Sequence, residues 1–592
     1  MLKGKFVKKC KWLCLFMLVP LVLTSCSDIL DLGFLTETTP AEQYEEYFDG
    51  ISAIRGEIMV ETADVSNLNL EYSERDLSTD YDGSSATRIV FSDSGSTVYG
   101  KGAETDGSDV VISAAGTYII SGNAHGALLT VKASTEDDIH LVFSGLSLVG
   151  KSGTALDIRS AASVLLTLIG ENFLSDFSEY KPSALDKQTG AVILSRAALS
   201  VNGAGSLSVV GNRSHGIVSQ SELILTGGKL NVRTTEAGLI GERCVKIGGG
   251  ELYIEAEEEG VLSGKVLGEE ETSKYETPTE QTSGYIYISG GVLDITATGD
   301  AIRAESLLII EDGVIDLTTG VRIDEVEKEE ETAETLPNFW EIFEFDEADD
   351  AETDERAFTV FSDGLYAASD ILIYGGTLAI DASNHAISSG QTICIDGGRF
   401  LIHSVHNGLY AEGAVGISDG ILIFENSRSG IESKSVDISG GHVYIGKTNR
   451  GVVTSGALRL SGGVLAVAGA KELPLDFGVA TVTGGVLAAL GNASIAREFF
   501  PTESQGVILC RFAMQNSGYP LALCDNEGKV LLSLEGKADY SMAYLSVPQV
   551  KNGNVYTLMS GGFAPKSDRY GFAMDTEAMI GAEPLTVVTA NS

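Results

Sequence analysis

Five polar or aromatic residues in the second half of the chain occupy one position of a repeat of about 22 residues. Each lies two residues after a glycine or alanine that precedes an aliphatic residue, and the five are Arg303, Tyr366, Ser388, Tyr410 and Glu432. If successive repeats stack as strands, Tyr366 and Tyr410 lie two strands apart, about 10 Å. This distance is comparable to a disaccharide of an extended β-linked glycan, so the two flat rings could stack on sugar faces. The alternative is an exposed tyrosine ladder that only favours sheet formation.

Three more side chains, His403, Tyr444 and Arg450, are expected to point outward near these tyrosines and could supply hydrogen bonds to a ligand. All of these positions require elements that bring residues about 22 apart in the chain to adjacent places in space. A regular repeat in the sequence provides such elements.

Paired glycines, or Asp-Gly in their place, mark this repeat, and an alternation of apolar residues follows each pair, as in TGGKL and SGGVL. The second glycines are Gly228, Gly250, Gly291, Gly313, Gly376, Gly398, Gly420, Gly441, Gly463 and Gly485. Successive glycines lie 21 or 22 residues apart except for two steps of 41 and 63, which are one period plus insertions of 19 and 41 residues. The second landmark, Gly or Ala before an aliphatic residue, keeps the same spacing. Two landmarks in phase indicate repeated structural units.

Between the landmarks the pattern has period 2, as in DILIY at 370–374 and LDIT at 293–296, which predicts short β-strands. One aliphatic residue per repeat stands two positions before the first glycine of the pair, and these are Leu225, Ile247, Ile288, Ile310, Ile373, Ile395, Ile417, Ile438 and Leu460. We expect them to stack in the interior, and alternate positions to point outward. The sequence therefore predicts an all-β solenoid, a parallel β-helix with about 22 residues per rung.

The N-terminus has the features of an export signal, because five lysines before residue 12 precede an apolar run from Trp12 to Leu23. Leu23-Thr24-Ser25-Cys26 resembles the lipobox of bacterial lipoproteins, in which the cysteine is lipidated. We predict a lipoprotein signal peptide at 1–25, a lipid anchor at Cys26, and a location on the extracellular face of the bacterial cell membrane or the cell surface. The alternative is an ordinary signal peptide that contains a cysteine.

The charge of the chain is strongly negative. Without residues 1–25, 35 basic and 83 acidic residues give a net charge of −48. Such a charge repels nucleic acid and anionic lipid, and it repels anionic polysaccharide unless a divalent cation intervenes. Nucleic acid is therefore excluded as a partner, and we expect a monomer.

The repeat also divides the chain. The predicted parts are a tether at 26–65, an irregular N-terminal part of the β-helix at 66–180, regular rungs at 181–492, and a C-terminal β cap or accessory domain at 500–592. Irregular terminal repeats are typical of solenoids, whose ends must cover the core.

Two insertions interrupt the rungs, near 265–283 and near 321–358. The second is acidic but contains NFWEIFEF at 338–345, with Trp340, the only tryptophan after the signal peptide. These aromatic residues either fold back on the solenoid or are presented to a polysaccharide.

Four cysteines follow Cys26, at 244, 394, 510 and 524, without the CxxC spacing of zinc or redox sites. Cys510 and Cys524 either form a disulfide across a hairpin or remain buried thiols.

Several segments carry a resemblance to a known family. GTYIISG at 116–122, DDIHLVFSGLSL at 137–148 and GENFLSD at 170–176, followed by the GGxLxI repeats, closely resemble a family of secreted bacterial carbohydrate-binding proteins. ERDLSTDYD at 74–82, both insertions and the C-terminal segment share the resemblance. It implies a right-handed parallel β-helix related to polysaccharide lyases, which binds pectic or cellulosic plant cell-wall polysaccharides and holds calcium in acidic turns.

The implied calcium ligands are only partly present. In the family, Asp-Asp or Gly-Asp typically precedes the Gly/Ala landmark and places oxygen ligands about 4.8 Å apart along the axis. The acidic residues at this position here are Glu236, Glu258, Glu259, Asp300 and Asp363. They are either calcium ligands or solvated turn carboxylates. Later rungs have Asn384-His385, His406-Asn407, Arg428-Ser429 and Asn449-Arg450, where calcium is not expected.

The sequence thus favours a non-catalytic lipoprotein that binds a polysaccharide through Tyr366, Tyr410, His403, Tyr444 and Trp340. A calcium-dependent polysaccharide lyase is the alternative, because β-elimination needs a metal and an unprotonated Arg or Lys. Asp300 with Arg303 beside Glu258 is the nearest such set. A surface adhesin that binds protein is a third possibility.

Overall fold

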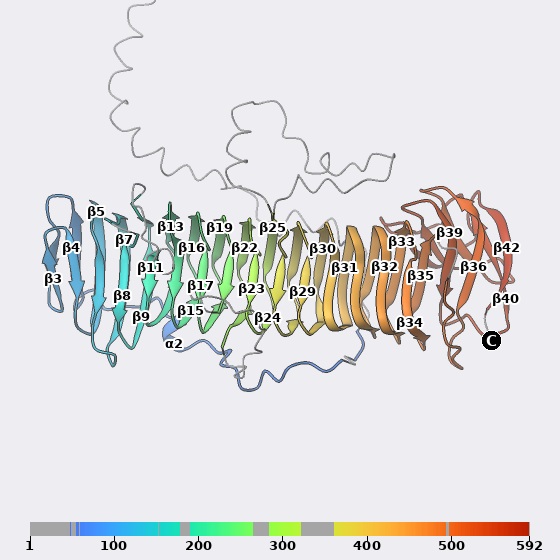
Figure 1. The fold of residues 1–592 in the computed structure, drawn as a ribbon, viewed down its shortest axis with the longest axis horizontal. Helices are drawn as coiled ribbons and strands as arrows, with labels where there is room; N and C mark the ends of the chain where they lie inside the picture. Colours follow the sequence, from blue (N-terminus) through green and yellow to red (C-terminus); the bar gives the residue numbers. More distant parts are fainter. Residues whose placement is uncertain are drawn as a thin grey trace, which may run out of the picture.

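The fold is described from a computed structural model, which covers Phe48 and residues 55–57, 60–151, 153–177, 190–264, 283–320, 360–492 and 496–590. In this part of the chain nearly every regular element is a β-strand, and α2 (Glu74–Leu77) is a single helical turn. The strands form one elongated solenoid that ends in a second, smaller sheet (Figure 1). No helix of the described residues is long and apolar enough to span a membrane.

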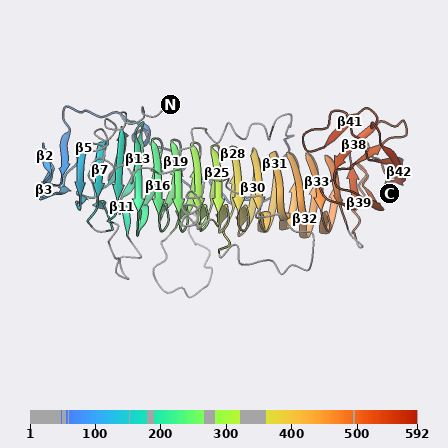
Figure 2. The same cartoon turned by 90° about the horizontal axis from the view of Figure 1, so that it is seen from above.

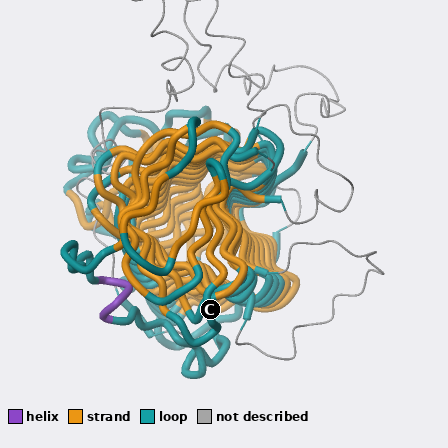
Figure 3. Tube along the Cα trace, turned by 90° about the vertical axis from the view of Figure 1, so that its left-hand side faces the viewer, coloured by secondary structure: helices purple, strands orange, loops and turns teal. Residues whose placement is uncertain are grey.

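The solenoid has three walls, and within each wall the strands pair in parallel with those of the previous rung. Figure 3 shows the strands of successive rungs superposed around a common interior. The first wall consists of β4 (Asp109–Ile112), β6 (Leu129–Lys132), β8 (Leu156–Ser160), β11 (Ala191–Ser195), β14 (His215–Ser219), β17 (Leu239–Gly241), β20 (Val261–Ser263), β23 (Ile302–Ala304), β26 (Leu365–Ala367), β29 (Ile387–Ser389) and the start of β31 (Asn407–Ile438).

The second wall consists of β1 (Thr87–Ser92), β5 (Gly116–His125), β7 (Asp138–Val149), β9 (Ser163–Ile169), β12 (Ala198–Gly203), β15 (Glu222–Leu225), β18 (Cys244–Ile247), β21 (Tyr285–Ile288), β24 (Leu308–Ile310), β27 (Ile371–Ile373) and the start of β30 (Thr392–Ser404). The third wall consists of β10 (Glu171–Ser175), β13 (Ser206–Gly211), β16 (Lys229–Thr234), β19 (Glu251–Ala256), β22 (Val292–Ala297), β25 (Val314–Thr319), β28 (Thr377–Ala382), the later parts of β30 and β31, β32 (His442–Leu460), β33 (Val464–Ala470) and β35 (Val486–Gly491).

The last rungs are joined by long strands that continue from one wall into the next, and β34 (Leu475–Val482) pairs with β32. At the N-terminal end, β2 (Thr97–Tyr99) pairs antiparallel with β1, and β3 (Ala103–Asp106) pairs antiparallel with β4. These two strands depart from the parallel pattern at the end of the solenoid.

The predicted stack of aliphatic residues forms the interior. Each of the nine side chains from Leu225 to Leu460 is 2% exposed or less. All ten second glycines have a positive φ, between 67° and 137°, a region that favours glycine over L-residues. At Gly420 a Cβ would also lie 3.0 Å from the carbonyl oxygen of Gly397 in the rung below. The glycine period therefore sets one turn per rung, and the predicted all-β parallel solenoid is confirmed.

An extended segment, residues 55–57 and 60–78, lies along the second wall and is called the N-terminal strap below. The strap runs along the solenoid axis in the direction opposite to that in which the rungs succeed one another. Its first residues contact a late rung, where Gly56 donates to the Ser418 carbonyl at 2.6 Å, and its last residues contact an early rung, where Asp76 accepts from Ser200 at 2.6 Å. Its apolar residues, from Val60 to Tyr72, cover a buried cluster that includes Cys244 and Cys394. Residues 60–65, predicted as part of the tether, therefore pack on the solenoid.

The C-terminal region closes the other end. β36 (Ile508–Gln515) and β39 (Tyr540–Ser546) extend the solenoid sheet in antiparallel pairing, with β39 against β35. A second sheet has the order β41 (Ala573–Thr576), β38 (Val530–Glu535), β37 (Pro520–Cys524), β40 (Val555–Ser560) and β42 (Glu583–Thr589). Figure 2 shows β38 and β41 beside β33, where their apolar residues cover the outer face of the third wall. Cys510 and Cys524 are free and buried, so they do not form a disulfide.

Candidate functional site

The outward row expected from the repeat lies on the first wall. Arg303 pairs in register with Tyr366, Tyr366 with Ser388, and Ser388 with Tyr410. Tyr366 and Tyr410 are therefore two rungs apart, as the period predicts. Both tyrosines are half-buried, and Ser388 between them is buried.

Each tyrosine ring has a protein group as a partner. The Arg303 guanidinium lies over Tyr366, 4.4 Å from the ring centroid. The His385 ring stacks on Tyr410 with centroids 4.8 Å apart and an interplanar angle of 15°. One face of each tyrosine is thus occupied by a protein group, and a sugar can stack only on what remains of each ring.

The stacked rings continue toward the turns at the edge of the first wall. The His385 ring lies 5.9 Å from that of His406, which in turn lies 5.3 Å from Phe361. Phe361 is 50% exposed. His385 directly precedes the landmark Ala386, and His406 stands two residues before the landmark Gly408. The repeat therefore places the two histidines on adjacent rungs, and their contact could have been inferred from it.

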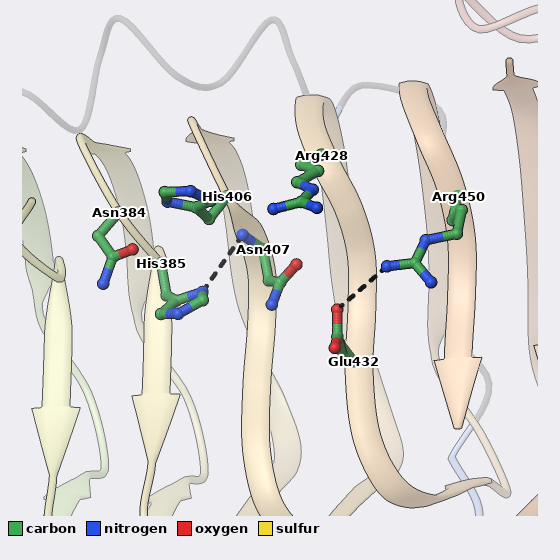
Figure 4. A pocket seen from close by; sticks show the side chains of 7 residues that line it. All are labelled: Asn384, His385, His406, Asn407, Arg428, Glu432 and Arg450. Atoms are coloured by element: carbon green, nitrogen blue, oxygen red, sulfur yellow. Dashed lines mark hydrogen bonds and ion pairs between the residues drawn. The ribbon is translucent and has the colours of Figure 1, made fainter. Parts of the chain in front are cut away.

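A pocket of about 250 Å³ opens beside these rings at the turns of four consecutive rungs (Figure 4). Its lining residues are Asn384, His385, His406, Asn407, Arg428, Glu432 and Arg450. The His385 Nδ1 accepts a hydrogen bond of 3.3 Å from the backbone N–H of Asn407, whose side chain is buried. The two guanidinium groups extend toward the preceding rungs.

The two imidazoles of the pocket are neutral at pH 7. Burial lowers the pKa of His385 to about 4, with a further contribution from His406. Burial also lowers the pKa of His406, and the charge of Arg428 acts in the same direction. Neutral imidazole offers one donor and one acceptor nitrogen. The positive charge of the pocket therefore comes from its arginines.

The two arginines differ in their partners. Arg450 Nη2 lies 3.8 Å from Glu432 Oε2, a long contact between side chains that are 28% and 34% exposed. The exposed Arg428 side chain has no hydrogen-bond or ion-pair partner in the part of the chain that the structure describes. One guanidinium is thus available to a ligand, and a second is loosely held.

The acidic residues predicted as calcium ligands lie in the preceding rungs. Glu236 contacts the Nε2 atom of His215 at 3.1 Å. Burial raises the pKa of Glu258 and Glu259, and neighbouring carboxylates raise both further. Burial, followed by the charge of Asp300, raises the pKa of Asp363 to about 7.

The oxygens of Asp300 and Asp363 already have protein partners. Asp300 accepts from Arg303 at 3.0 Å and from the Asp363 backbone N–H at 2.8 Å. Asp363 Oδ1 accepts from the Asn384 amide at 2.7 Å and from the His385 N–H at 3.0 Å. Among the described residues no group of three or more His, Cys, Asp or Glu is placed to hold one metal ion. A calcium ion bound there would have to displace these protein donors.

Two of the residues predicted to bind the polysaccharide lie on a wall other than the first. His403 is on the third wall, where its Nε2 contacts Glu425 at 2.6 Å. Tyr444 is also on the third wall, and the expectation that it faces solvent is wrong. Its side chain points outward but is covered by the C-terminal region, with the Tyr570 ring at 4.5 Å, and is 2% exposed. The predictions for Trp340 and Cys26 lie outside the described residues.

Comparison with known proteins places this site in a known family. A family model described as "Carbohydrate-binding domain-containing protein" matches residues 106–408 and 344–484, and the second match contains the whole pocket. The chain belongs to this carbohydrate-binding family.

A member from Acetivibrio thermocellus with the same description is 29% identical over 128 residues. That alignment covers 21% of this chain and 45% of the relative, so the chain matches less than half of the relative's length. A solved structure titled as the polysaccharide lyase-like protein from C. thermocellum, gadolinium derivative, is similar at 27% identity. The alignment covers 40% of this chain and 92% of the chain in that structure, with a TM-score of 0.35.

Proposed function

We propose that this protein is a non-catalytic cell-surface lipoprotein that binds a polysaccharide along the first wall, from Arg303 and Tyr366 to the pocket beside Tyr410. The observation that carries this proposal is the stacked His385–Tyr410 pair next to the pocket. It joins a ring surface and neutral hydrogen-bonding groups in one place.

The chemistry of the pocket suits sugar hydroxyls. A hydroxyl both donates and accepts. The neutral His406 imidazole and the Asn407 amide also offer both functions, and His385, whose Nδ1 accepts from the Asn407 N–H, offers its Nε2–H as a donor. The rungs repeat about every 4.8 Å. An extended glycan that lies along the solenoid axis would therefore meet equivalent positions on successive rungs. Pectic and cellulosic glycans of plant cell walls are the proposed ligands, and Cys26 is the proposed lipid anchor.

A binding function is favoured over the lyase alternative by the state of Arg303. A lyase needs an unprotonated Arg or Lys as the base. Although burial alone would lower it, the neighbouring carboxylates of Asp300 and Glu305 raise the pKa of Arg303 above its ordinary value. Both carboxylates contact this guanidinium at 3.0 Å. Arg303 is thus held as a cation.

Retention of the mature chain, made soluble by Cys26→Ser, on immobilised pectate, cellulose and xylan tests the proposal. We expect retention without release of unsaturated sugar products. Tyr410→Ala should weaken retention roughly 2- to 10-fold, from a ring contact of about 0.5–1.5 kcal/mol. Tyr99→Ala, which removes a 61% exposed tyrosine at the far end of the solenoid, is the matched control. Unsaturated products would indicate a lyase, and no retention on any glycan would indicate an adhesin.

Calcium is a separate proposal with its own test. To bind the ion, Asp300 and Asp363 would have to exchange Arg303 and the Asn384 amide for it. Calorimetric titration of the metal-free chain with Ca²⁺ tests the calcium site. A heat of binding that is lost in Asp363→Asn would support the site, and the absence of any heat of binding would contradict it.

A further inference from the structure

The character of the side chains before the Gly/Ala landmark changes along the solenoid. Carboxylates stand there in the rungs of Glu259, Asp300 and Asp363. The next two rungs have an amide and an imidazole each, and the two after that have Arg428 and Arg450. The pocket lies on the neutral and cationic rungs. In a chain with a net charge of −43, this local change of sign distinguishes the pocket from the rungs before it.

We propose that Arg428 and Arg450 bind an anionic substituent of the glycan, a carboxylate or a sulfate ester, directly and without a bridging metal ion. The inference rests on the proposed function and names the class of glycan that the site takes. In the acidic rungs an anion would need a cation as a bridge, whereas in these rungs the guanidinium groups supply the positive charge themselves.

The geometry of the two arginines fits this role. A guanidinium presents parallel N–H groups that match the two oxygens of a carboxylate or sulfate. Arg428 has no protein partner among the described residues, and its guanidinium extends toward His406 and Asn407 (Figure 4). Arg450 contacts Glu432 only at 3.8 Å, so most of its donors are open to a ligand.

The surroundings set the direction in which the anion lies. On the rungs before the pocket, Arg303 is already paired with Asp300 and the Asn384 amide donates to Asp363, so an anion finds no free donor from these groups. The pocket volume of about 250 Å³ is slightly below the roughly 300–1,000 Å³ of small-molecule sites, so one substituted sugar is the expected occupant. His385 and His406 then contact hydroxyls of that sugar or its neighbour.

The test compares charged and neutral forms of the same polymers in the presence of EDTA. The mature Cys26→Ser chain is run by affinity electrophoresis through polygalacturonate and its methyl ester, and through cellulose sulfate and neutral hydroxyethyl cellulose. We expect at least one charged polymer to bind more tightly than its neutral form, and the polymer that does so identifies carboxylate or sulfate as the group. Arg428→Gln should reduce that preference roughly tenfold or more, the effect of losing a charge-assisted hydrogen bond.

Two further variants separate specific recognition from general charge. Arg428→Lys keeps the charge but loses the paired donors, so it should lie between the wild type and Arg428→Gln. Arg459→Gln removes a 60% exposed arginine outside the pocket and should leave the preference unchanged. Equal effects of Arg428→Gln and Arg459→Gln would overturn the inference, and so would a preference that EDTA abolishes. Binding of neutral and charged forms alike would overturn it while leaving the proposed function intact. No binding to any polymer would overturn both.

Discussion

Replacement of Asp294 by Asn tests the in-register stacking of the rungs on which the site depends. Asp294 on β22 and Asp316 on β25 are 22 residues apart in the chain and directly paired in the third wall. Burial, followed by the charges of Asp316 and Glu255, raises the pKa of Asp294 to about 6 from 3.8. Only the stacking of the repeats brings Asp294 and Asp316 together.

The magnitude follows from the shift. About two pKa units correspond to roughly 3 kcal/mol, and since Asp294 keeps some solvent contact we expect about 1–2 kcal/mol. The folded state holds this proton more tightly than the unfolded state does. The contribution of Asp294 to stability is therefore largest below about pH 4, falls as the pH rises from about 4 to 6, and is constant above.

Asp294→Asn should remove this fall and stabilise the protein by about 1–2 kcal/mol at pH 7. Urea unfolding from pH 4 to 8, followed by circular dichroism, measures the effect. Asp106→Asn, at an exposed position of β3, is the control and should keep the wild-type pH dependence. An Asp294→Asn protein with the pH dependence and stability of the wild type would refute the stacking of these two carboxylates.

Two other predictions concern the turns and the strap. Gly420→Ala places a Cβ 3.0 Å from a carbonyl oxygen at a φ of 102°, so it should lower the free energy of unfolding by more than about 1 kcal/mol in the same urea assay. Gly107→Ala is the control, because a Cβ there meets open space, and it should lower the free energy of unfolding by less. Deletion of the N-terminal strap should speed the reaction of Cys244 and Cys394 with a thiol reagent, because the strap covers both and burial raises the pKa of their thiols to about 11 and about 12. The two C-terminal cysteines, which the strap does not cover, are internal controls, and equal labelling rates before and after deletion would contradict the docking of the strap.

The glycine period was sufficient to predict the solenoid and its interior, because a fixed period specifies which residues stack along the axis. It also placed Tyr366 and Tyr410 two rungs apart on one wall. The period could also have predicted the pocket, because Asn384, His406 and Arg428 occupy the same position of successive repeats. From the sequence, only the loss of calcium ligands was predicted at these positions.

What the sequence did not predict comes from segments without a repeat. The strap has apolar residues such as Leu68 and Leu70 in a polar context, and they pack on a cluster of side chains from several rungs that comes together only when the rungs stack. Tyr444 points outward as the period requires, yet Tyr570 of the C-terminal region covers it. No pattern within either segment encodes a contact between two parts so distant in the chain.

The most direct test of the account is a crystal structure of the mature chain with a bound oligosaccharide of the glycan that it retains. We expect sugar density on the first wall, against the Tyr410 ring and within hydrogen-bonding distance of His406 and Arg428. Density confined to the second or third wall, with this pocket empty of sugar, would contradict it.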